Sequence, residues 1–204
     1  MLTQIYRHSF SMSTGFHTYE NLSFCSKHYV PRSCTQCTLR YIFATTIAKG
    51  GGIMTIKEIP GDLFTATDTT FMQCISADIA CGAGIAISFN KHFDIKNRIK
   101  KRLEQLPMDY WDEGHSGFAI LEKPVINLVT KRRYFEKPTE ETLKNALNAA
   151  VQICKEQNVK TIAMPYIASG LDRMNWKTQV RPAIEQAFAG TDIDITVYKG
   201  PSKT

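Results

Sequence analysis

Two glycine-containing stretches hold the residues with the clearest chemical potential. The first, residues 77–84, ends in Gly82, Ala83 and Gly84, and the second, residues 168–172, contains Gly170. Glycine lets a backbone approach a ligand closely, and successive amide N–H groups at the start of a helix attract an anion. Both stretches therefore suit phosphate binding, although Gly-x-Gly alone is a weak signal and more often forms only a turn.

Basic residues form two clusters, from Lys96 to Arg102 and at Lys131-Arg132-Arg133. The chain has 25 Lys and Arg against 19 Asp and Glu, a net charge of +6. Residues 1–53 hold 5 basic and 1 acidic residue, so 20 basic and 18 acidic remain in residues 54–204. Because this larger part is nearly neutral, a phosphate-bearing small ligand explains the clusters as readily as a nucleic acid. The first cluster also fits a solvated helix face.

Four potential metal ligands lie in the first quarter of the chain, at Cys25, His28, Cys34 and Cys37. Their paired spacing could hold a zinc ion tetrahedrally. Only five residues separate the two pairs, whereas zinc modules of this kind have 12 or more. We therefore expect no metal site.

The elements that must position the glycine stretches alternate between strands and helices. Apolar and β-branched runs predict strands over residues 53–59, 71–76, 118–121, 125–131, 161–167 and 193–198. Amphipathic periodicity predicts helices over residues 85–93, 95–106, 139–158 and 176–189. Thr139 should cap the third helix, and Pro182 should kink or weaken the fourth.

This alternation predicts a three-layer α/β/α sandwich around a mixed central sheet. Ligands of such sheets bind beyond the carboxyl ends of the strands. Both glycine stretches directly follow a predicted strand, so they could face each other across one crevice.

The composition is typical of a soluble globular protein of one or at most two domains, with 204 residues, 43% of them hydrophobic and 22% charged. No apolar run approaches the roughly 20 residues of a membrane span, and residues 6–9 interrupt any apolar stretch of a secretory signal. We expect a cytoplasmic protein with free thiols. Cys74, Cys81 and Cys154 are expected to fill the core.

Residues 1–53 show no repeating apolar period, so they are predicted to be a disordered extension of a domain over residues 54–204. A transit peptide is an alternative, because the segment is poor in acidic residues. A third hypothesis, which we favour, is that the segment is not translated and the chain starts at Met54, since codons for Lys49 to Gly52 can spell the ribosome-binding sequence of a bacterial or phage gene before Met54.

Five motifs occur in order along the chain: Gly61-Asp62-Leu63-Phe64, Cys74-Ile75-Ser76, Gly82-Ala83-Gly84-Ile85-Ala86, Leu128-Val129-Thr130-Lys131, and Met164-Pro165 through Gly170-Leu171-Asp172-Arg173. Together they resemble the macro domain family, specifically the branch of terminal ADP-ribose protein glycohydrolase. The resemblance extends over nearly all of residues 58–199. It implies a macro fold that binds ADP-ribose or an ADP-ribosylated macromolecule, as a monomer without a cofactor.

The resemblance also implies binding residues. Asp62 corresponds to a carboxylate that hydrogen-bonds the adenine amino group, and Leu63 to a residue beside the adenine. Ile75 and Ser76 correspond to the pocket wall. The two phosphate loops correspond to Gly82, Ala83, Gly84 and Ile85, and to Ser169, Gly170 and Leu171.

Lys131 and Asp172 correspond to the catalytic pair of this branch. A lysine amine can attack the anomeric carbon of the distal ribose and expel the acyl oxygen of a modified acidic side chain. Asp172 would serve as the acid and base. Partial burial and the charge of Arg133, expected on the same strand face, would favour the neutral amine of Lys131.

The chain departs from the family pattern at two places. The second loop usually reads Gly-Cys-Gly, and here it is Ala168-Ser169-Gly170. If position 168 needs a positive φ, alanine costs about 1 kcal/mol or more. In the longer segment before residue 117, Tyr110, Trp111 and His115 form either a lid or, as we favour, a packed loop.

The leading functional hypothesis is an enzyme that removes ADP-ribose from acidic side chains, or from related adducts such as O-acetyl-ADP-ribose or a base-linked ADP-ribose. A non-catalytic ADP-ribose reader and an ADP-ribose 1″-phosphate phosphatase are the alternatives. Nucleic acid is expected only as a modified substrate.

Overall fold

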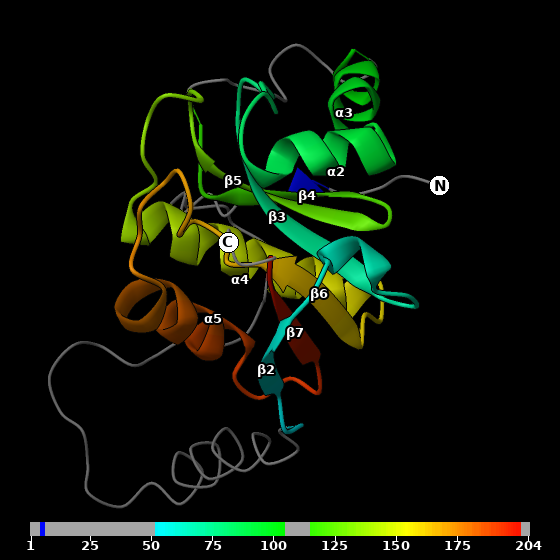
Figure 1. Cartoon of the computed structure of the whole chain (residues 1–204), viewed down its shortest axis with the longest axis vertical. Coiled ribbons are helices and arrows are strands. Elements are labelled where there is room, and N and C mark those ends of the chain that lie inside the picture. The colour runs from blue at the N-terminus through cyan, green and yellow to red at the C-terminus, as the bar shows by residue number, and fades with distance from the viewer. Residues whose placement is uncertain (1–4, 7–51, 105–114, 201–204) are drawn as a thin grey trace, which may run out of the picture. The chain divides into compact units, whose positions relative to one another are not determined.

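Seven strands form one mixed sheet in the computed structural model, which describes residues 5–6, 52–104 and 115–200 (Figure 1). The order across the sheet is β1-β4-β5-β3-β6-β7-β2. The strands are β1 (Ile5–Tyr6), β2 (Thr55–Pro60), β3 (Thr70–Ser76), β4 (Phe118–Glu122), β5 (Val125–Lys131), β6 (Thr161–Pro165) and β7 (Asp194–Lys199). Five strands, from β5 to β2 in this order, run parallel, whereas β4 and β1 are antiparallel to their neighbours. The carboxyl ends of the five parallel strands therefore share one edge.

The chain divides into two units, residues 1–8 with 52–204 and residues 9–51. The second unit lies outside the described residues, and so do the four candidate zinc ligands. Tyr110 and Trp111 also lie outside them. The short strand β1 falls in the segment for which the sequence predicts no fold.

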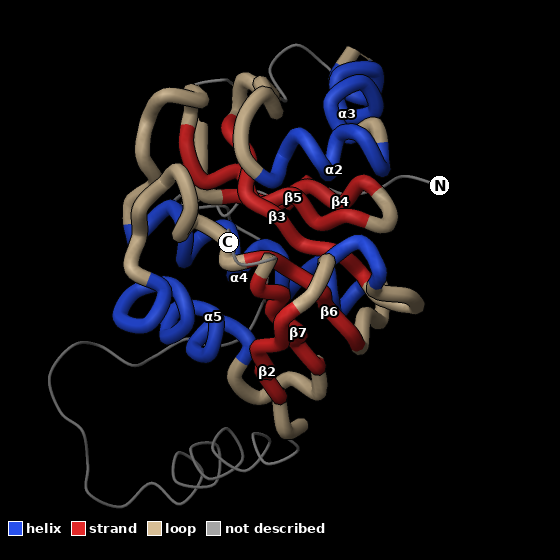
Figure 2. Tube along the Cα trace, in the orientation of Figure 1, coloured by secondary structure: helices blue, strands red, loops and turns tan. Residues whose placement is uncertain are grey.

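Helices cover both faces of the sheet (Figure 2). α2 (Ile85–Phe93) and α3 (Ile95–Leu103) pack on one face, and α4 (Glu140–Glu156) and α5 (Arg181–Phe188) on the other. Each face of the sheet has its own hydrophobic core, a smaller one under α2 and α3 and a larger one under α4 and α5. Alternate residues of a strand point to opposite faces, so Val125 and Val129 of β5 join the smaller core, whereas Leu128 joins the larger core. The predicted three-layer α/β/α architecture is confirmed. Among the described helices, none has the length and apolar character that a membrane span needs.

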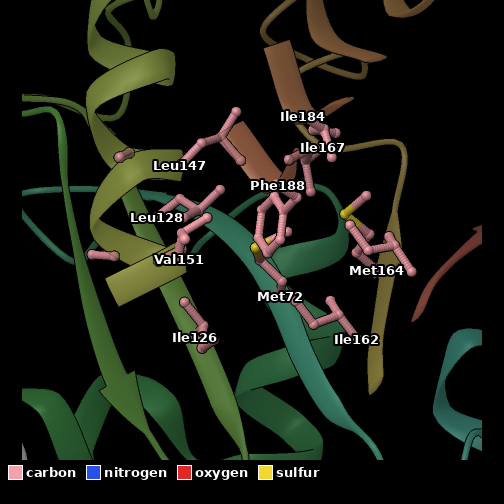
Figure 3. Packing of buried hydrophobic residues seen from close by; sticks show 14 of the residues in the cluster. Met72, Ile126, Leu128, Leu147, Val151, Ile162, Met164, Ile167, Ile184 and Phe188 are labelled. Carbon is pink, nitrogen blue, oxygen red and sulfur yellow. The ribbon is translucent and has the colours of Figure 1, made fainter. Parts of the chain in front are cut away.

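The larger core holds the central strands against α4 and α5 (Figure 3). Met72 of β3 and Leu128 of β5 are fully buried there, together with Leu147 of α4 and Phe188 of α5. Burying side chains of this size stabilises the fold by about 1.5–3 kcal/mol each. This packing fixes the two strands that end beside the candidate site.

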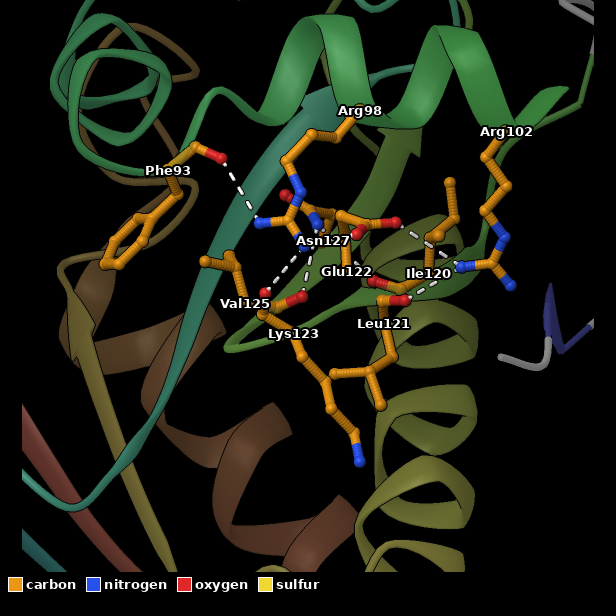
Figure 4. Close-up of polar contacts among 9 residues, drawn as sticks. All are labelled: Phe93, Arg98, Arg102, Ile120, Leu121, Glu122, Lys123, Val125 and Asn127. Carbon is orange, nitrogen blue, oxygen red and sulfur yellow. Dashed lines mark hydrogen bonds and ion pairs between the residues drawn. The ribbon is translucent and has the colours of Figure 1, made fainter. Parts of the chain in front are cut away.

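Two arginines of the first basic cluster attach α3 to the hairpin of β4 and β5 (Figure 4). Arg98 Nη2 lies 2.6 Å from Glu122 Oε1, and Arg102 Nη1 lies 3.5 Å from Glu122 Oε2. Both guanidinium groups also donate to backbone carbonyls, Arg98 to Lys123 and Arg102 to Leu121. Part of this basic cluster therefore makes ion pairs and hydrogen bonds within the protein, so it is not entirely the solvated helix face that its charge suggests.

The predicted helix over residues 176–189 is divided in two. A π-helical turn, η2 (Trp176–Val180), precedes α5, which begins at Arg181. Pro182 therefore lies in the first turn of α5, where a backbone N–H has no acceptor within the helix. The expected kink takes the form of a change in helix type. A short 3-10 helix, η1 (Leu63–Thr65), occurs where the sequence predicts no element.

Thr139 caps α4 as predicted, and it does so reciprocally. Thr139 Oγ1 accepts from the Thr142 amide at 3.1 Å, and Thr142 Oγ1 accepts from the Thr139 amide at 3.0 Å. We expect Thr139→Ala to lower the free energy of unfolding by about 1 kcal/mol, measured by urea denaturation. Thr139→Ser keeps the hydroxyl and should lose less than about 0.5 kcal/mol. Equal losses in the two variants would contradict the role of the cap.

Candidate functional site

A cavity of about 1200 Å³ lies at the shared edge where the parallel strands end. The ends of β3, β5, β6 and β7 contribute Ser76, Lys131, Pro165 and Lys199 to its wall. Both glycine loops, which follow β3 and β6, also line it. The expectation that the two loops face one crevice is confirmed.

Lys131 and Asp172 meet at this cavity. Lys131 is the last residue of β5, Asp172 lies in the loop after β6, and Nζ and Oδ1 are 2.5 Å apart. Only 13% of the lysine side chain and 10% of the aspartate side chain are exposed. Because surrounding protein weakens solvent screening, an ammonium and a carboxylate at this distance interact strongly and can exchange a proton directly.

Arg133 does not lie on the strand face expected for it. β5 ends at Lys131, and Arg133 follows in a bend. The charge of Arg133 instead acts on Asp78, one of the influences that lower the pKa of that carboxyl.

The Asp78 carboxylate joins the first glycine loop to the segment that follows Lys131. It accepts hydrogen bonds from Ser76 Oγ at 2.5 Å, from the Tyr134 amide at 2.9 Å and from the Ala80 amide at 3.3 Å. Burial raises the pKa of Asp78, but these hydrogen bonds and the charge of Arg133 outweigh burial and hold the pKa below its ordinary value. The carboxylate therefore stays ionised and keeps the three segments together.

The two glycine loops approach each other at Gly84. Its φ of +60° is costly for residues with a side chain, and a Cβ there would lie 3.4 Å from Leu171 Cδ1. Gly84 is also the residue before α2, so the positive N-terminus of that helix adjoins the cavity. From α3, Lys96 Nζ supports this loop by donating to the Ala80 carbonyl at 3.2 Å.

Ala168, in the second loop, has a φ of +53°. The condition under which alanine is costly there is therefore met, with a strain of about 1–2 kcal/mol. Packing holds the position, because Ala168 is only 6% exposed and belongs to the larger core. Its carbonyl also accepts from the Met174 amide at 3.0 Å.

The cavity extends to a polar cluster centred on Glu58 that sequence reasoning does not reveal. Glu58 Oε2 accepts from Tyr166 Oη at 2.6 Å, and Oε1 accepts from Trp176 Nε1 and Arg181 Nη1, each at 2.9 Å. The rings of Tyr166 and Trp176 meet edge to face, with centroids 4.6 Å apart. Hydrogen bonds from Tyr166 and Trp176 outweigh burial and, with the charges of Lys199 and Arg181, lower the pKa of Glu58 from 4.5 to about 2.

The cysteines divide between the core and the cavity. Cys154 is buried in the larger core, as expected, and burial raises its pKa to about 12. Cys74 and Cys81 instead line the cavity, which corrects the expectation that they only fill the core. Burial, followed by the charge of Asp172, raises the pKa of Cys74 to about 12, so this thiol is neutral at pH 7.

Most of the expected site residues line this cavity. They are Ile75, Ser76, Gly82, Ala83, Gly84, Ile85, Lys131, Ser169, Gly170, Leu171 and Asp172. Asp62 and Leu63 lie outside its lining. Asp62 Oδ1 accepts from the Phe64 amide at 3.0 Å and caps η1, and Leu63 is 4% exposed in the smaller core. Within the described ranges, no three His, Cys, Asp or Glu side chains gather as a metal site.

Glu58→Gln tests the electrostatics of the Glu58 cluster. At pH 7 we expect the free energy of unfolding to fall by about 1–3 kcal/mol. The amide NH₂ of glutamine would face a hydrogen-bond donor at a position where a carboxylate oxygen of Glu58 now accepts a hydrogen bond. The pKa of Glu58 is depressed, so its contribution is present above about pH 4.5 and is lost as the pH falls toward about 2. Urea unfolding of wild type and variant should therefore converge over this range.

The matched control is Glu185→Gln, which removes an exposed carboxylate 2.9 Å from the same Arg181. It should change stability by less than about 0.5 kcal/mol at either pH. A difference between wild type and Glu58→Gln that does not vary with pH would contradict the assigned ionisation.

Comparison with known proteins identifies the family. The macro domain sequence model matches residues 115–183. The ADP-ribose glycohydrolase OARD1 of Homo sapiens is 37% identical over 151 residues, covering 70% of this chain and 90% of the relative, and the Bos taurus protein matches to the same extent. Both relatives are mammalian, so they give no support to the bacterial or phage origin suggested by the codons before Met54.

Solved structures agree on the fold. The macrodomain of Thermus aquaticus DarG superposes with a TM-score of 0.59 at 21% identity, covering 72% of this chain and 99% of that one. An Oceanobacillus iheyensis macrodomain with MES bound gives a TM-score of 0.60 at 15% identity, covering 76% of this chain and 86% of that one. With the 37% identity to OARD1, these matches show that the chain belongs to the macro domain family, in the branch that resembles terminal ADP-ribose protein glycohydrolase.

Proposed function

We propose that this protein is an ADP-ribosyl hydrolase that releases ADP-ribose from modified acidic side chains. The observation that carries the proposal is the Lys131–Asp172 pair, 2.5 Å apart and nearly buried at the wall of a cavity with two glycine loops. The relatives named ADP-ribose glycohydrolase, 37% identical to this chain, support it.

The cavity suits an elongated dinucleotide. From β5, which ends in Lys131, to β2 there are four strand steps, or about 19 Å at roughly 4.8 Å a step. The diphosphate would lie between Gly84 and Leu171, where backbone amides and the N-terminus of α2 offer positive charge. The distal ribose would then adjoin Lys131. The adenine would lie near the end of β2, which precedes Asp62 and Leu63, the two residues that the family resemblance assigns to it.

The reaction begins with a proton transfer within the pair. The Lys131 ammonium gives a proton to the Asp172 carboxylate, which leaves a neutral amine beside the anomeric carbon. The lysine nitrogen forms a bond to this carbon while the bond from the carbon to the acyl oxygen breaks. The electron pair leaves with the carboxylate of the modified side chain.

A water molecule completes the cycle. Asp172 first loses to solvent the proton that it took from Lys131. It then accepts a proton from the water molecule while the water oxygen attacks the anomeric carbon. The bond from this carbon to the lysine nitrogen breaks, and ADP-ribose and the free amine result. The low exposure of both side chains limits competing reactions with bulk water.

Lys131→Ala and Asp172→Ala test the assignment. On a glutamate-linked ADP-ribosyl peptide, each variant should lose at least about 10²-fold in kcat, whereas calorimetry should find ADP-ribose affinity within about tenfold of wild type. Lys144→Ala removes an exposed lysine of α4 and should behave as wild type. Mass spectrometry of quenched wild-type reactions should detect sugar bound to Lys131, and Lys131→Ala should show no such adduct.

Two results would replace the proposal. Binding of ADP-ribose without turnover by the wild-type chain would make the protein a reader. Release of phosphate from ADP-ribose 1″-phosphate, with no cleavage of the acyl ester, would make it a phosphatase.

A further inference from the structure

Exposed apolar side chains gather at the mouth of the cavity. Of the six large hydrophobic residues exposed in the described ranges, four lie there: Ile85, Tyr134, Phe135 and Leu171, here called the apolar rim. Ile85, Tyr134 and Leu171 line the cavity, and the Phe135 ring meets the Tyr134 ring edge to face with centroids 5.3 Å apart. Tyr134 is 65% and Phe135 68% exposed. Exposed apolar side chains gathered in this way indicate an interaction site.

The segment that carries the two aromatic rings is held in place on both sides. The Tyr134 amide donates to Asp78 Oδ2 at 2.9 Å. Farther along, Lys137 Nζ donates to the carbonyl of Leu171, which lies beside Asp172. Within the segment, the Glu136 amide donates to the Arg133 carbonyl at 3.1 Å. A surface fixed by these contacts loses little conformational entropy when a partner binds.

The apolar rim lies where the leaving group must depart. Tyr134 is three residues beyond Lys131, and Leu171 directly precedes Asp172. Tyr134 and Leu171 line the same cavity as Lys131, so a bond broken beside Lys131 would release its leaving group toward these side chains. Resting on the proposed hydrolase function, we propose that the apolar rim docks the polypeptide that carries the modified side chain.

Charge specifies the chemistry of this polypeptide. Residues 131–137 include four basic residues and one acidic residue. Because Lys131 pairs with Asp172 and Arg132 with Glu136, the excess positive charge of this segment lies on the exposed side chains of Arg133 and Lys137. An acidic peptide with an apolar residue next to the modified glutamate or aspartate complements this combination of positive charge and exposed rings.

The same surface fits a nucleic acid less well. Nucleic acids are bound along a row of cations that contact successive phosphates. Here Arg132 pairs with Glu136 at 3.2 Å, and Arg98 and Arg102 of α3 pair with Glu122. The aliphatic members of the apolar rim, Ile85 and Leu171, add contacts that suit side chains of a protein.

Substitutions of Phe135 test the docking, because Phe135 belongs to the apolar rim but does not line the cavity. The substrates are a glutamate-linked ADP-ribosyl peptide with acidic flanking residues and the small ester O-acetyl-ADP-ribose. On the peptide, kcat/KM should fall about fivefold in Phe135→Ala. It should fall more than about tenfold in Phe135→Glu, because the added negative charge repels the acidic residues of the peptide. Phe135→Lys should recover part of the loss. On the small ester, all three variants should stay within about twofold of wild type.

Ile87→Ala is the matched control, because Ile87 is 52% exposed on α2 and does not line the cavity. It should leave both substrates unaffected. An equal loss on peptide and small ester in the Phe135 variants would overturn the docking, as would an effect of Ile87→Ala as large as that of Phe135→Ala. If the Phe135 variants lost kcat/KM only on an ADP-ribosylated oligonucleotide, the apolar rim would bind nucleic acid, and the proposed docking of a polypeptide would be overturned.

Failure of the proposed function gives a different result. If the wild-type chain cleaves neither substrate, the hydrolase proposal fails, and calorimetry still tests the docking. The ADP-ribosyl peptide should then bind at least about tenfold tighter than free ADP-ribose to wild type, with this advantage absent in Phe135→Glu. Equal affinity of wild type for the two ligands would overturn the docking.

Discussion

Parallel pairing of β3 with both β5 and β6 is the constraint on which the site depends. This pairing brings the end of β5 and the loop after β6 to one edge, although Lys131 and Asp172 are 41 residues apart in the sequence. The buried side chains of Met72 and Leu128 hold these strands in register against α4. A shift of one residue would exchange the two faces of a strand and move Lys131 away from its carboxylate. The chemistry of the site is thus a consequence of the register of the sheet.

Two ionised carboxylates complete this arrangement. Asp78 joins the end of β3, the first glycine loop and the segment after β5. Glu58 joins β2 to Tyr166, Trp176 and Arg181. Each carboxylate accepts at least three hydrogen bonds, so neither has much remaining capacity for a ligand. Their contribution is to hold segments that line the cavity, and their low pKa values keep this contribution intact at neutral pH.

The sequence predicts most of the fold, because the strands and helices carry strong periodic patterns. The continuous apolar run of β5 and the cap at Thr139 are both predicted from local residues, and both are confirmed. The π-helical turn η2 has no comparable pattern, since the residues before Pro182 fit an α-helix equally well. Local propensity therefore indicates where a helix lies but not its type.

The site was predictable to a similar degree. The glycine loops and the Lys131–Asp172 pair belong to contiguous motifs, so their meeting could be expected from a family resemblance. The Glu58 cluster could not, because its members come from β2, the loop after β6, η2 and α5, and only the fold brings them together. Asp62 shows the opposite case, in which a recognisable motif residue caps η1 and lies outside the cavity lining.

The close approach of Leu171 to Gly84 affects how quickly a ligand could be exchanged. Leu171 lines the crevice beside Gly84, where the diphosphate would lie, and Leu171 is itself 62% exposed. Exposed side chains change rotamer within nanoseconds, whereas collective movements of whole domains take microseconds or longer. Rotation of this single leucine would widen the space beside Gly84 while Asp78 and Lys137 keep both loops anchored. Opening of the crevice at this point is therefore far faster than a typical turnover of about 10 per second.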